Sequence, residues 1–417
     1  MARSGFVYVQ DRTLALDGST FRHIGVNCPN LAYYEGWQGK ETQLAAARDM
    51  GARVIRIFAG RNDLSHSAAA AYIRNLADLA LYSYGLRLLV SFTNLYSGGQ
   101  HPQGDDRYYE NVSGWYVLGS AFFYGGFREN YLPWVRELVG ALRNHPGVFA
   151  WEIGNELKFD PDPQAFVNFA QEVVQTIRGI DPDHLITSGL MDVSHPALSQ
   201  SQALALYQGM DIVSVHCYGR DHSKNDLWIA DSLGLAHIVG EAGHPKNGRG
   251  DDLTFDLNDW FNNLGSDGYY QWGFMATPYD NGDGDRLYGM DHVFFDDWDT
   301  LFAIYRAFAN YLGTGPPPPP PRYTCINGEC VADASGEYGS LNECLATCQP
   351  PGQATAGIPW ALLLGLAMGA AGFAVLAAAR LGITPELEVV LSPGQRVVDV
   401  REINEGEPVP PGYRVVG

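Results

Sequence analysis

Short β-rich runs alternate with amphipathic stretches through the first three quarters of this 417-residue chain, and this alternation restricts the fold more than any other feature. We predict strands at residues 23–27, 53–58, 87–93, 149–154, 184–189, 212–217, 236–242 and 268–274. We predict helices between them at residues 39–50, 68–84, 131–144, 163–179 and 256–263. Parallel strands need a crossover, usually a helix, so eight such repeats predict a closed (β/α)8, or TIM, barrel.

Two segments mark the limits of the predicted barrel domain, which we place at residues 1–312. Residues 6–16 alternate about Asp11-Arg12, and we expect a hairpin there that covers the bottom of the barrel. At residues 313–322 the pattern breaks into Gly-Thr-Gly and a run of six prolines. Because proline fixes φ and lacks an N–H, this run predicts a stiff linker and not a helix or central strand.

Residues 323–349 form a short segment that contains four of the six cysteines, namely Cys325, Cys330, Cys344 and Cys348. Such a short segment cannot bury a sufficient core, so we expect a small module held by two disulfides, with three possible connectivities. A zinc site is the alternative, although the spacing is not that of paired Cys-x2-Cys ligands. The other two, Cys28 and Cys217, end predicted strands that lie far apart around a barrel, so we expect buried thiols.

Residues 358–379 contain no charged side chain, and we expect a transmembrane helix there, followed by a tail at residues 380–417. A buried core helix is the alternative, but a segment placed after a linker has no core to enter. Arginines follow this segment, which places the predicted catalytic domain outside the cytosol, at a cell surface, in a secretory lumen or on a viral envelope. Residues 1–5 show no apolar signal segment, and the route of export stays open.

The formal net charge of −20 bears on possible partners. Phosphate-rich polymers repel a chain of this charge, so we expect no nucleic-acid partner. The acidity itself is equally explained by the solubility that an exported protein needs.

Two glutamates stand at the ends of predicted strands and carry most of the information about chemistry. Glu156 follows the run Phe-Ala-Trp-Glu-Ile-Gly-Asn, and Glu241 follows His-Ile-Val-Gly. In a parallel barrel the loops after the strands meet at one end, so side chains at strand ends can face one another. Two facing carboxylates supply the proton donor and the nucleophile or base that glycosidic bond cleavage requires.

Asn155-Glu156, followed by a later strand-end Glu241, resembles the glycoside hydrolase clan GH-A, over roughly residues 5–312. Within that clan the endo-β-1,4-mannanases of glycoside hydrolase family 5 are most similar, through the segments at residues 25–27, 181–187 and 211–216. The resemblance implies that Glu156 is the acid/base and Glu241 the nucleophile of a retaining reaction. It implies no cofactor and no metal.

The resemblance also assigns supporting roles to five residues. Asn155 would bond the sugar 2-hydroxyl, Arg56 and Tyr218 would contact the nucleophile, His216 would be a site histidine, and Trp272 would floor the cleaved sugar's subsite. Considered alone, an arginine on a strand commonly forms a structural ion pair, and a tryptophan on a strand commonly packs in the hydrophobic core. We expect a raised pKa at Glu156, from partial burial and the second carboxylate. We expect Glu152 to be a structural acid inside the barrel.

Two departures from the family pattern affect the predicted substrate. Many members have proline where this chain has Leu157, and family cellulases often have histidine where this chain has Thr93-Asn94. The second departure favours a mannanase. We therefore expect a membrane-anchored, retaining endo-β-glycosidase acting on β-1,4-mannan. A β-glucanase or an exo-β-glycosidase on the same scaffold is one alternative, and an inactive cell-surface or viral-envelope glycan-binding protein is another.

Overall fold

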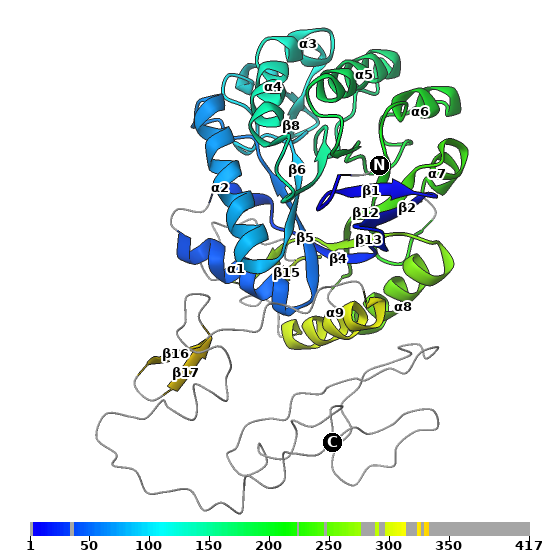
Figure 1. The fold of residues 1–417 in the computed structure, drawn as a ribbon. Helices are drawn as coiled ribbons and strands as arrows, with labels where there is room; N and C mark the ends of the chain where they lie inside the picture. The colour runs from blue at the N-terminus through cyan, green and yellow to red at the C-terminus, as the bar shows by residue number, and fades with distance from the viewer. Residues whose placement is uncertain are drawn as a thin grey trace, which may run out of the picture. The chain divides into compact units, whose positions relative to one another are not determined.

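Eight parallel strands close into a barrel in the computed structural model (Figure 1). The structure describes residues 3–33, 37–222, 225–245, 248–276, 288–291, 297–313, 323–326 and 329–332. In chain order the barrel strands are β4 (His23–Asn27), β5 (Ala52–Phe58), β6 (Arg87–Ser91), β9 (Val148–Glu152), β10 (Leu185–Thr187), β11 (Ile212–Tyr218), β12 (Ala236–Gly243) and β13 (Gly268–Gln271). Each predicted strand is present and β13 pairs with β4 to close the ring, so the predicted barrel is confirmed.

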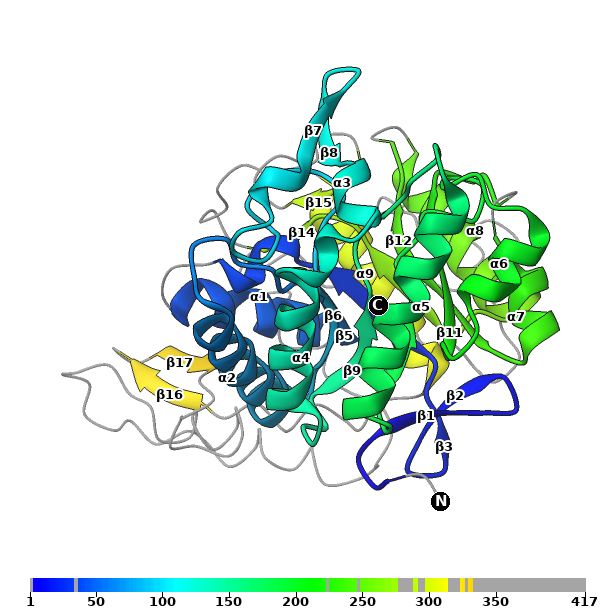
Figure 2. The ribbon, with the colours of Figure 1, turned by 90° about the horizontal axis from the view of Figure 1, so that it is seen from above.

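Helices surround the strands (Figure 2). They are α1 (Trp37–Asp49), α2 (His66–Tyr84), α4 (Tyr131–Leu142), α5 (Pro163–Ile180), α6 (Gln200–Leu206), α7 (Leu227–Leu233), α8 (Arg249–Asn258) and α9 (Trp298–Leu312). Local sequence signals set their limits. Ser65 accepts a hydrogen bond from the Ala68 N–H at the start of α2, and Gly85 ends that helix in the left-handed region.

The predicted helix at residues 256–263 began too late. α8 starts at Arg249, and a π-helical turn, η4 (Asp259–Asn263), continues from it. The sequence prediction also missed α6, α7 and α9. The first two are only seven residues long, too short to show a clear helical period.

A small antiparallel sheet covers the N-terminal end of the barrel. It comprises β1 (Val7–Gln10), β2 (Thr13–Leu16) and β3 (Ser19–Thr20), and the predicted hairpin turns at Asp11 and Arg12. Its apolar side chains pack with residues at the strand starts in one buried cluster: Val7, Leu14, Phe21, Val54, Phe149 and Ile238. This end of the barrel is therefore filled.

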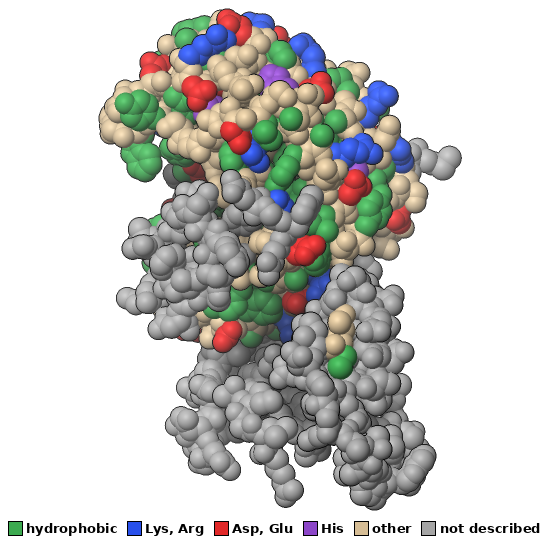
Figure 3. All heavy atoms as spheres, turned by 90° about the vertical axis from the view of Figure 1, so that its left-hand side faces the viewer, with side chains coloured by type: hydrophobic (Ala, Val, Ile, Leu, Met, Phe, Trp, Pro, Cys, Tyr) green, Lys and Arg blue, Asp and Glu red, His purple; other side chains and the backbone are tan. Residues whose placement is uncertain are grey.

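The opposite end carries the longer connections. Between β6 and α4 the chain forms a hairpin of β7 (Tyr109–Val112) and β8 (Trp115–Leu118), followed by α3 (Ser120–Phe123). After β13 come the short parallel strands β14 (Phe274–Met275) and β15 (Met290–Asp291). On the face drawn in Figure 3, the coloured acidic and basic side chains are interspersed, and neither sign gathers into one patch.

A separate compact unit contains β16 (Tyr323–Ile326) and β17 (Glu329–Ala332), an antiparallel pair in which Cys325 lies opposite Cys330. Of the predicted linker at residues 313–322, residues 314–322 lie outside the described part of the chain. Cys344, Cys348, the predicted span at residues 358–379 and the tail also lie outside the described residues. Disulfide connectivity therefore stays a prediction. In the described part of the chain, no helix has the length and apolarity needed to cross a membrane. Cys28 and Cys217 are buried and not joined in a disulfide, as expected.

Candidate active site

The seven predicted site residues come together at the C-terminal end of the barrel. Arg56 lies on β5, His216 and Tyr218 on β11, and Glu241 on β12. The remaining three lie beyond strand ends: Asn155 and Glu156 lie shortly after β9, and Trp272 directly follows β13. Tyr218 and Trp272 are half-buried and the other five are buried.

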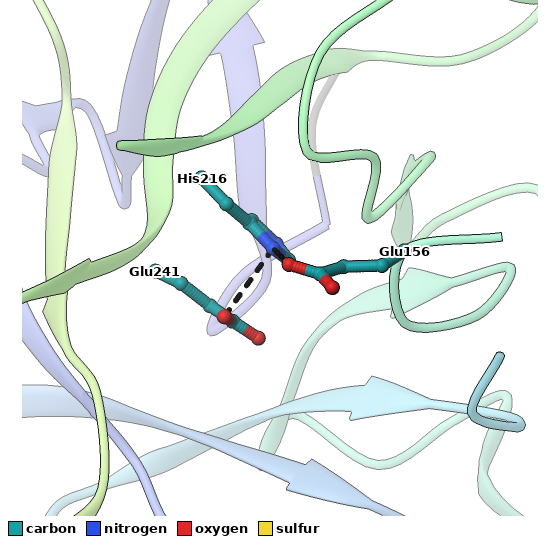
Figure 4. A group of neighbouring side chains, drawn as sticks. All are labelled: Glu156, His216 and Glu241. Carbon is teal, nitrogen blue, oxygen red and sulfur yellow. Dashed lines mark hydrogen bonds and ion pairs between the residues drawn. The ribbon is translucent and has the colours of Figure 1, made fainter. Parts of the chain in front are cut away.

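The two glutamates approach each other closely, with His216 between them (Figure 4). One carboxylate oxygen of Glu156, one of Glu241 and a ring nitrogen of His216 all lie within 4.8 Å of one another. His216 Nδ1 lies 2.8 Å from Glu156 Oε1 and 3.3 Å from Glu241 Oε2. The geometric expectation from sequence, that these two carboxylates face one another, is confirmed.

Arg56 is the centre of the network below the glutamates. Its Nε and Nη2 donate to the two oxygens of Glu152 at 2.8 and 2.7 Å. Its Nη1 donates to Asn27 Oδ1 (2.9 Å) and to Glu241 Oε1 (2.5 Å), and its Nη2 also donates to Asn155 Oδ1 (2.8 Å). Burial lowers the pKa of Arg56, but Glu152 and Glu241 outweigh burial and raise it. Glu152 is thus the interior structural acid that we expected, bound to a fully buried cation.

Glu241 is held on both oxygens. Arg56 donates to one, and the Tyr218 hydroxyl donates to the other at 2.7 Å. The ladder between β11 and β12 shifts register after Val215, which places His216 opposite Glu241. Burial raises the pKa of Glu241, and His216, Arg56 and Tyr218 oppose this rise without cancelling it.

Glu156 occupies an unusual backbone conformation, with φ of +51°. A non-glycine residue in the left-handed region costs about 1–3 kcal/mol and persists where surrounding bonds fix it. Here the Glu156 N–H donates to Gly189 O (2.8 Å), and the preceding Asn155 N–H donates to Thr93 O (2.8 Å). The carboxylate is therefore aimed by the barrel rather than by a mobile loop.

The expected raised pKa of Glu156 is wrong for the free protein. Burial does raise it, but the hydrogen bond and the charge of His216 outweigh burial, and a hydrogen bond from Tyr96 adds to their effect. The pKa of Glu156 therefore lies below its ordinary value. The sequence argument counted the second carboxylate and left out the histidine that separates the two.

Comparisons with known proteins find similar curated proteins and solved structures, although no protein-family model matches the chain. Among curated proteins, it is similar to mannan endo-1,4-β-mannosidase A of Hypocrea jecorina, with 24% identity over 210 residues, 45% of this chain and 46% of that protein. Among solved structures, the endo-1,4-β-mannanase from Rhizomucor miehei gives a TM-score of 0.56 at 16% identity, covering 74% of this chain and 100% of that one. A family 5 mannosidase from the same organism gives 0.55 at 12% identity, covering 74% and 97%.

The chain has a family 5 mannanase-like fold. In this barrel, β9, which precedes Glu156, and β12, which carries Glu241, are the fourth and seventh strands in chain order. The chain spans about half the length of the curated relatives that it matches.

A polar network on one side of the barrel was not predicted from sequence. Asn155 Nδ2 donates to Asn94 Oδ1 (2.9 Å), Asn94 Nδ2 donates to Gln100 Oε1 (2.8 Å), and Gln100 Nε2 donates to Asn30 Oδ1 (2.7 Å). Asn94 thus orients Asn155 from the end of the third strand. The departure from histidine at this position was visible in the sequence, but its contact with Asn155 required the fold.

Tyr96 is the second residue that sequence reasoning missed. Its hydroxyl hydrogen-bonds the Glu156 carboxylate. It lies beyond the end of β6 in a connection without periodicity, so neither strand nor helix patterns point to it. An aromatic residue two positions after the strand-end Asn94 was the only available signal.

Glu156, His216 and Glu241 also have a spacing compatible with holding a metal ion. The environment opposes this use. Arg56 places a buried positive charge 2.5 Å from Glu241, and Tyr218 already donates to the other Glu241 oxygen. A second cation at this place would be repelled by the guanidinium.

Proposed function

We propose that this chain is a glycoside hydrolase that cleaves β-1,4-linked mannan in two displacement steps. The observation that supports it most is the pair Glu156 and Glu241, whose carboxylate oxygens approach within 4.8 Å at the open end of the barrel. Retaining glycosidases hold their carboxyl groups about 5–5.5 Å apart, and inverting enzymes need about 6.5–9.5 Å to admit a water molecule. The short separation favours a covalent intermediate.

In the first step a Glu241 oxygen attacks the anomeric carbon, and the bond to the glycosidic oxygen breaks. Glu156 gives its proton to that oxygen, and the leaving sugar departs as an alcohol. In the second step Glu156 takes a proton from water, which attacks the anomeric carbon and releases the Glu241 carboxylate. Loss of the Glu241 charge in the intermediate lowers the pKa of Glu156 and suits it to act as a base.

Glu156 has to gain a proton before the first step, because its pKa is lowered in the free protein. A sugar that excludes water from the cleft favours the neutral carboxyl group. His216 Nδ1, 2.8 Å from Glu156 Oε1, is within reach to deliver the proton.

The supporting residues fit the same role. Asn155 uses its oxygen for Arg56 and one N–H for Asn94, which leaves its second N–H to bind a sugar hydroxyl. Trp272 is half-buried, and its backbone N–H donates to O of Ala242 (2.7 Å), the residue after Glu241. An aromatic face at this position can pack against the apolar side of a sugar.

Mannan is the favoured substrate because the relatives are named as mannan-hydrolysing enzymes and because Asn94 replaces the histidine common in family cellulases. A β-glucanase or an exo-acting enzyme is the runner-up. We further propose that residues 358–379 anchor the protein in a membrane with the barrel outside the cytosol, where disulfides can form in residues 323–349.

The test is hydrolysis of β-1,4-mannan, mixed-linkage and β-1,4-glucans, and aryl β-glycosides by the purified protein. Glu241→Ala should abolish turnover. Glu156→Ala should slow mannan hydrolysis severely, but added azide should rescue turnover of an activated aryl glycoside. Glu137→Gln, on the exposed face of α4, is the matched control and should keep full activity. Absence of turnover on every substrate would favour an inactive glycan-binding protein, and a first-formed product of inverted configuration would contradict the covalent step.

A further inference from the structure

The β7–β8 hairpin is an exposed aromatic feature that the catalytic scheme does not use. It projects from the barrel (Figure 2) and turns through Ser113 and Gly114, both with positive φ. Three large apolar side chains are exposed on it: Val112 (53%), Trp115 (67%) and Tyr116 (55%). Exposed aromatic side chains grouped in this way commonly mark a binding surface.

The hairpin is fixed at its base, so its side chains have a defined direction. The Leu118 N–H donates to Leu95 O (3.0 Å), and the Ser97 N–H donates to Tyr116 O (2.9 Å). Tyr96 pairs with Val117 in an antiparallel bridge. Residues 95–97 therefore run beside β8 and tie it to the end of β6.

The two faces of the hairpin differ. The side chains of Trp115 and Val117 lie on the same face of β8, because they are two positions apart on the strand. Val112 lies on this face too, because it pairs directly with Trp115. Tyr116 points to the opposite face, where it pairs with Asn111. Adjacent aromatic residues of similar exposure thus face in opposite directions.

The face that carries Trp115 is continuous with the active site. The Trp115 ring meets the Tyr96 ring edge-on, with 5.7 Å between centroids. The Tyr96 hydroxyl in turn hydrogen-bonds Glu156. An apolar stripe, which we define as Tyr96, Val117, Trp115 and Val112, therefore leads from Glu156 out to solvent.

We propose that this stripe is a secondary subsite that binds a sugar residue of the polysaccharide chain beyond the sugar that reacts. The inference rests on the proposed function, since it extends the same cleft. The apolar face of a pyranose ring packs on an aromatic ring, and a chain anchored at Glu156 passes along the stripe. Residues 109–118 contain one acidic and no basic residue, so the hairpin lacks the positive charge that anionic lipid surfaces attract.

The experiment compares Trp115→Ala with its matched control Tyr116→Ala in the full-length protein. We measure kcat/KM on mannan and on manno-oligosaccharides of increasing length, and the affinity of the Glu241→Ala form of each variant for mannan. We expect Trp115→Ala to lower kcat/KM on mannan and the binding affinity about tenfold, mainly through KM, with a smaller loss as the substrate shortens. Trp115→Phe should recover part of the loss. Tyr116→Ala should have the same kcat/KM and the same affinity for mannan as the protein with Tyr116.

The outcomes separate this inference from the proposed function. In one outcome, the unsubstituted protein hydrolyses mannan and Trp115→Ala hydrolyses substrates of every length equally well. That result would contradict the proposed subsite and leave the proposed mannanase activity supported. An equal loss on short and long substrates, or the same loss in Tyr116→Ala, would indicate general damage to the hairpin and also overturns the subsite. If the unsubstituted protein neither hydrolyses nor binds mannan, both proposals are overturned.

Discussion

Arg56 combines structural and chemical roles in one side chain, because each of its five N–H groups is donated to a named acceptor. Two of its partners, Glu152 and Glu241, are buried carboxylates that form ion pairs with its guanidinium group. Lysine provides three donors at a single point and cannot serve acceptors on three sides. The barrel interior and the proposed nucleophile, Glu241, therefore depend on the same planar group.

Arg56→Lys should consequently reduce both stability and activity. We expect a loss of about 3 kcal/mol in the free energy of unfolding, because lysine keeps the charge but leaves buried acceptor oxygens without a donor. Denaturant unfolding measures the loss, and kcat/KM on mannan should fall by at least about a hundredfold. Arg136→Lys, on the exposed face of α4, is the control. If the two variants had the same free energy of unfolding, the five hydrogen bonds donated by Arg56 would not contribute to stability.

The two tyrosines that contact the proposed catalytic carboxylates should shift opposite limbs of the pH profile. The hydrogen bond from Tyr218 lowers the pKa of Glu241, and the hydrogen bond from Tyr96 lowers that of Glu156. In the free protein Glu241 has the raised pKa and sets the alkaline limb of kcat/KM, so Tyr218→Phe should move that limb up by about one pH unit. Glu156 has the lowered pKa and sets the acid limb, so Tyr96→Phe should move that limb up by a similar amount.

The measurement is the pH dependence of kcat/KM on a soluble manno-oligosaccharide. Each variant is expected to move one limb and leave the other near its original position. A downward shift in either variant, or movement of the same limb in both, would contradict the assignment of acid/base and nucleophile.

The secondary elements divide into those with a sequence signal and those without one. The eight strands were predictable because buried parallel strands read as short apolar runs. The short helices α6 and α7 and the β7–β8 hairpin were not, because seven- and four-residue elements are too short to show a period. The site followed the same division. Strand-end residues were found, whereas Tyr96 and the role of Asn94 depended on how a connecting loop folds back.

The connection between β6 and β7 contains a buried carboxyl group that makes stability depend on pH. Asp105, before η2 (Asp106–Tyr108), is fully buried, and burial raises its pKa to about 7, with Asn130 and Arg107 limiting the rise. The folded pKa exceeds the unfolded value of about 3.9. Its contribution to stability is therefore fully present below about pH 3.9 and is lost as pH rises through about 7.

Asp105→Asn should remove this dependence, because the amide has the shape of the neutral acid and carries no charge. We expect the variant to have a higher Tm than the unsubstituted protein above pH 7 and a smaller change in Tm between pH 4 and pH 8. Thermal unfolding across this range gives the comparison, with the exposed neighbour Asp106→Asn as control. A lower Tm for Asp105→Asn at pH 8 would show that the charged form is stabilised.

On the scale of the whole molecule, the described barrel is complete without the C-terminal segments. The closed ring runs from β4 to β13, α9 ends at Leu312, and every residue of the candidate site precedes Trp298. The small sheet of β1 to β3 fills one end of the barrel, so its opposite end is left for substrate. Catalysis and the proposed anchoring are then properties of different parts of the chain.

A protein ending at Gly313 should therefore fold and act like the full chain. We expect the same kcat/KM on soluble manno-oligosaccharides within about twofold, and a Tm of the barrel transition within a few degrees, since the closed ring of strands and α9 are kept. The full chain should sediment with membranes and resist extraction at high pH and high salt, whereas the truncated protein should stay in the supernatant. A variant lacking only residues 358–379 separates the anchor from the cysteine module, and it should follow the truncated protein in fractionation. Loss of catalysis in the truncated protein would assign the C-terminal segments a part in the active barrel, and a full chain that stays in the supernatant would remove the membrane anchor.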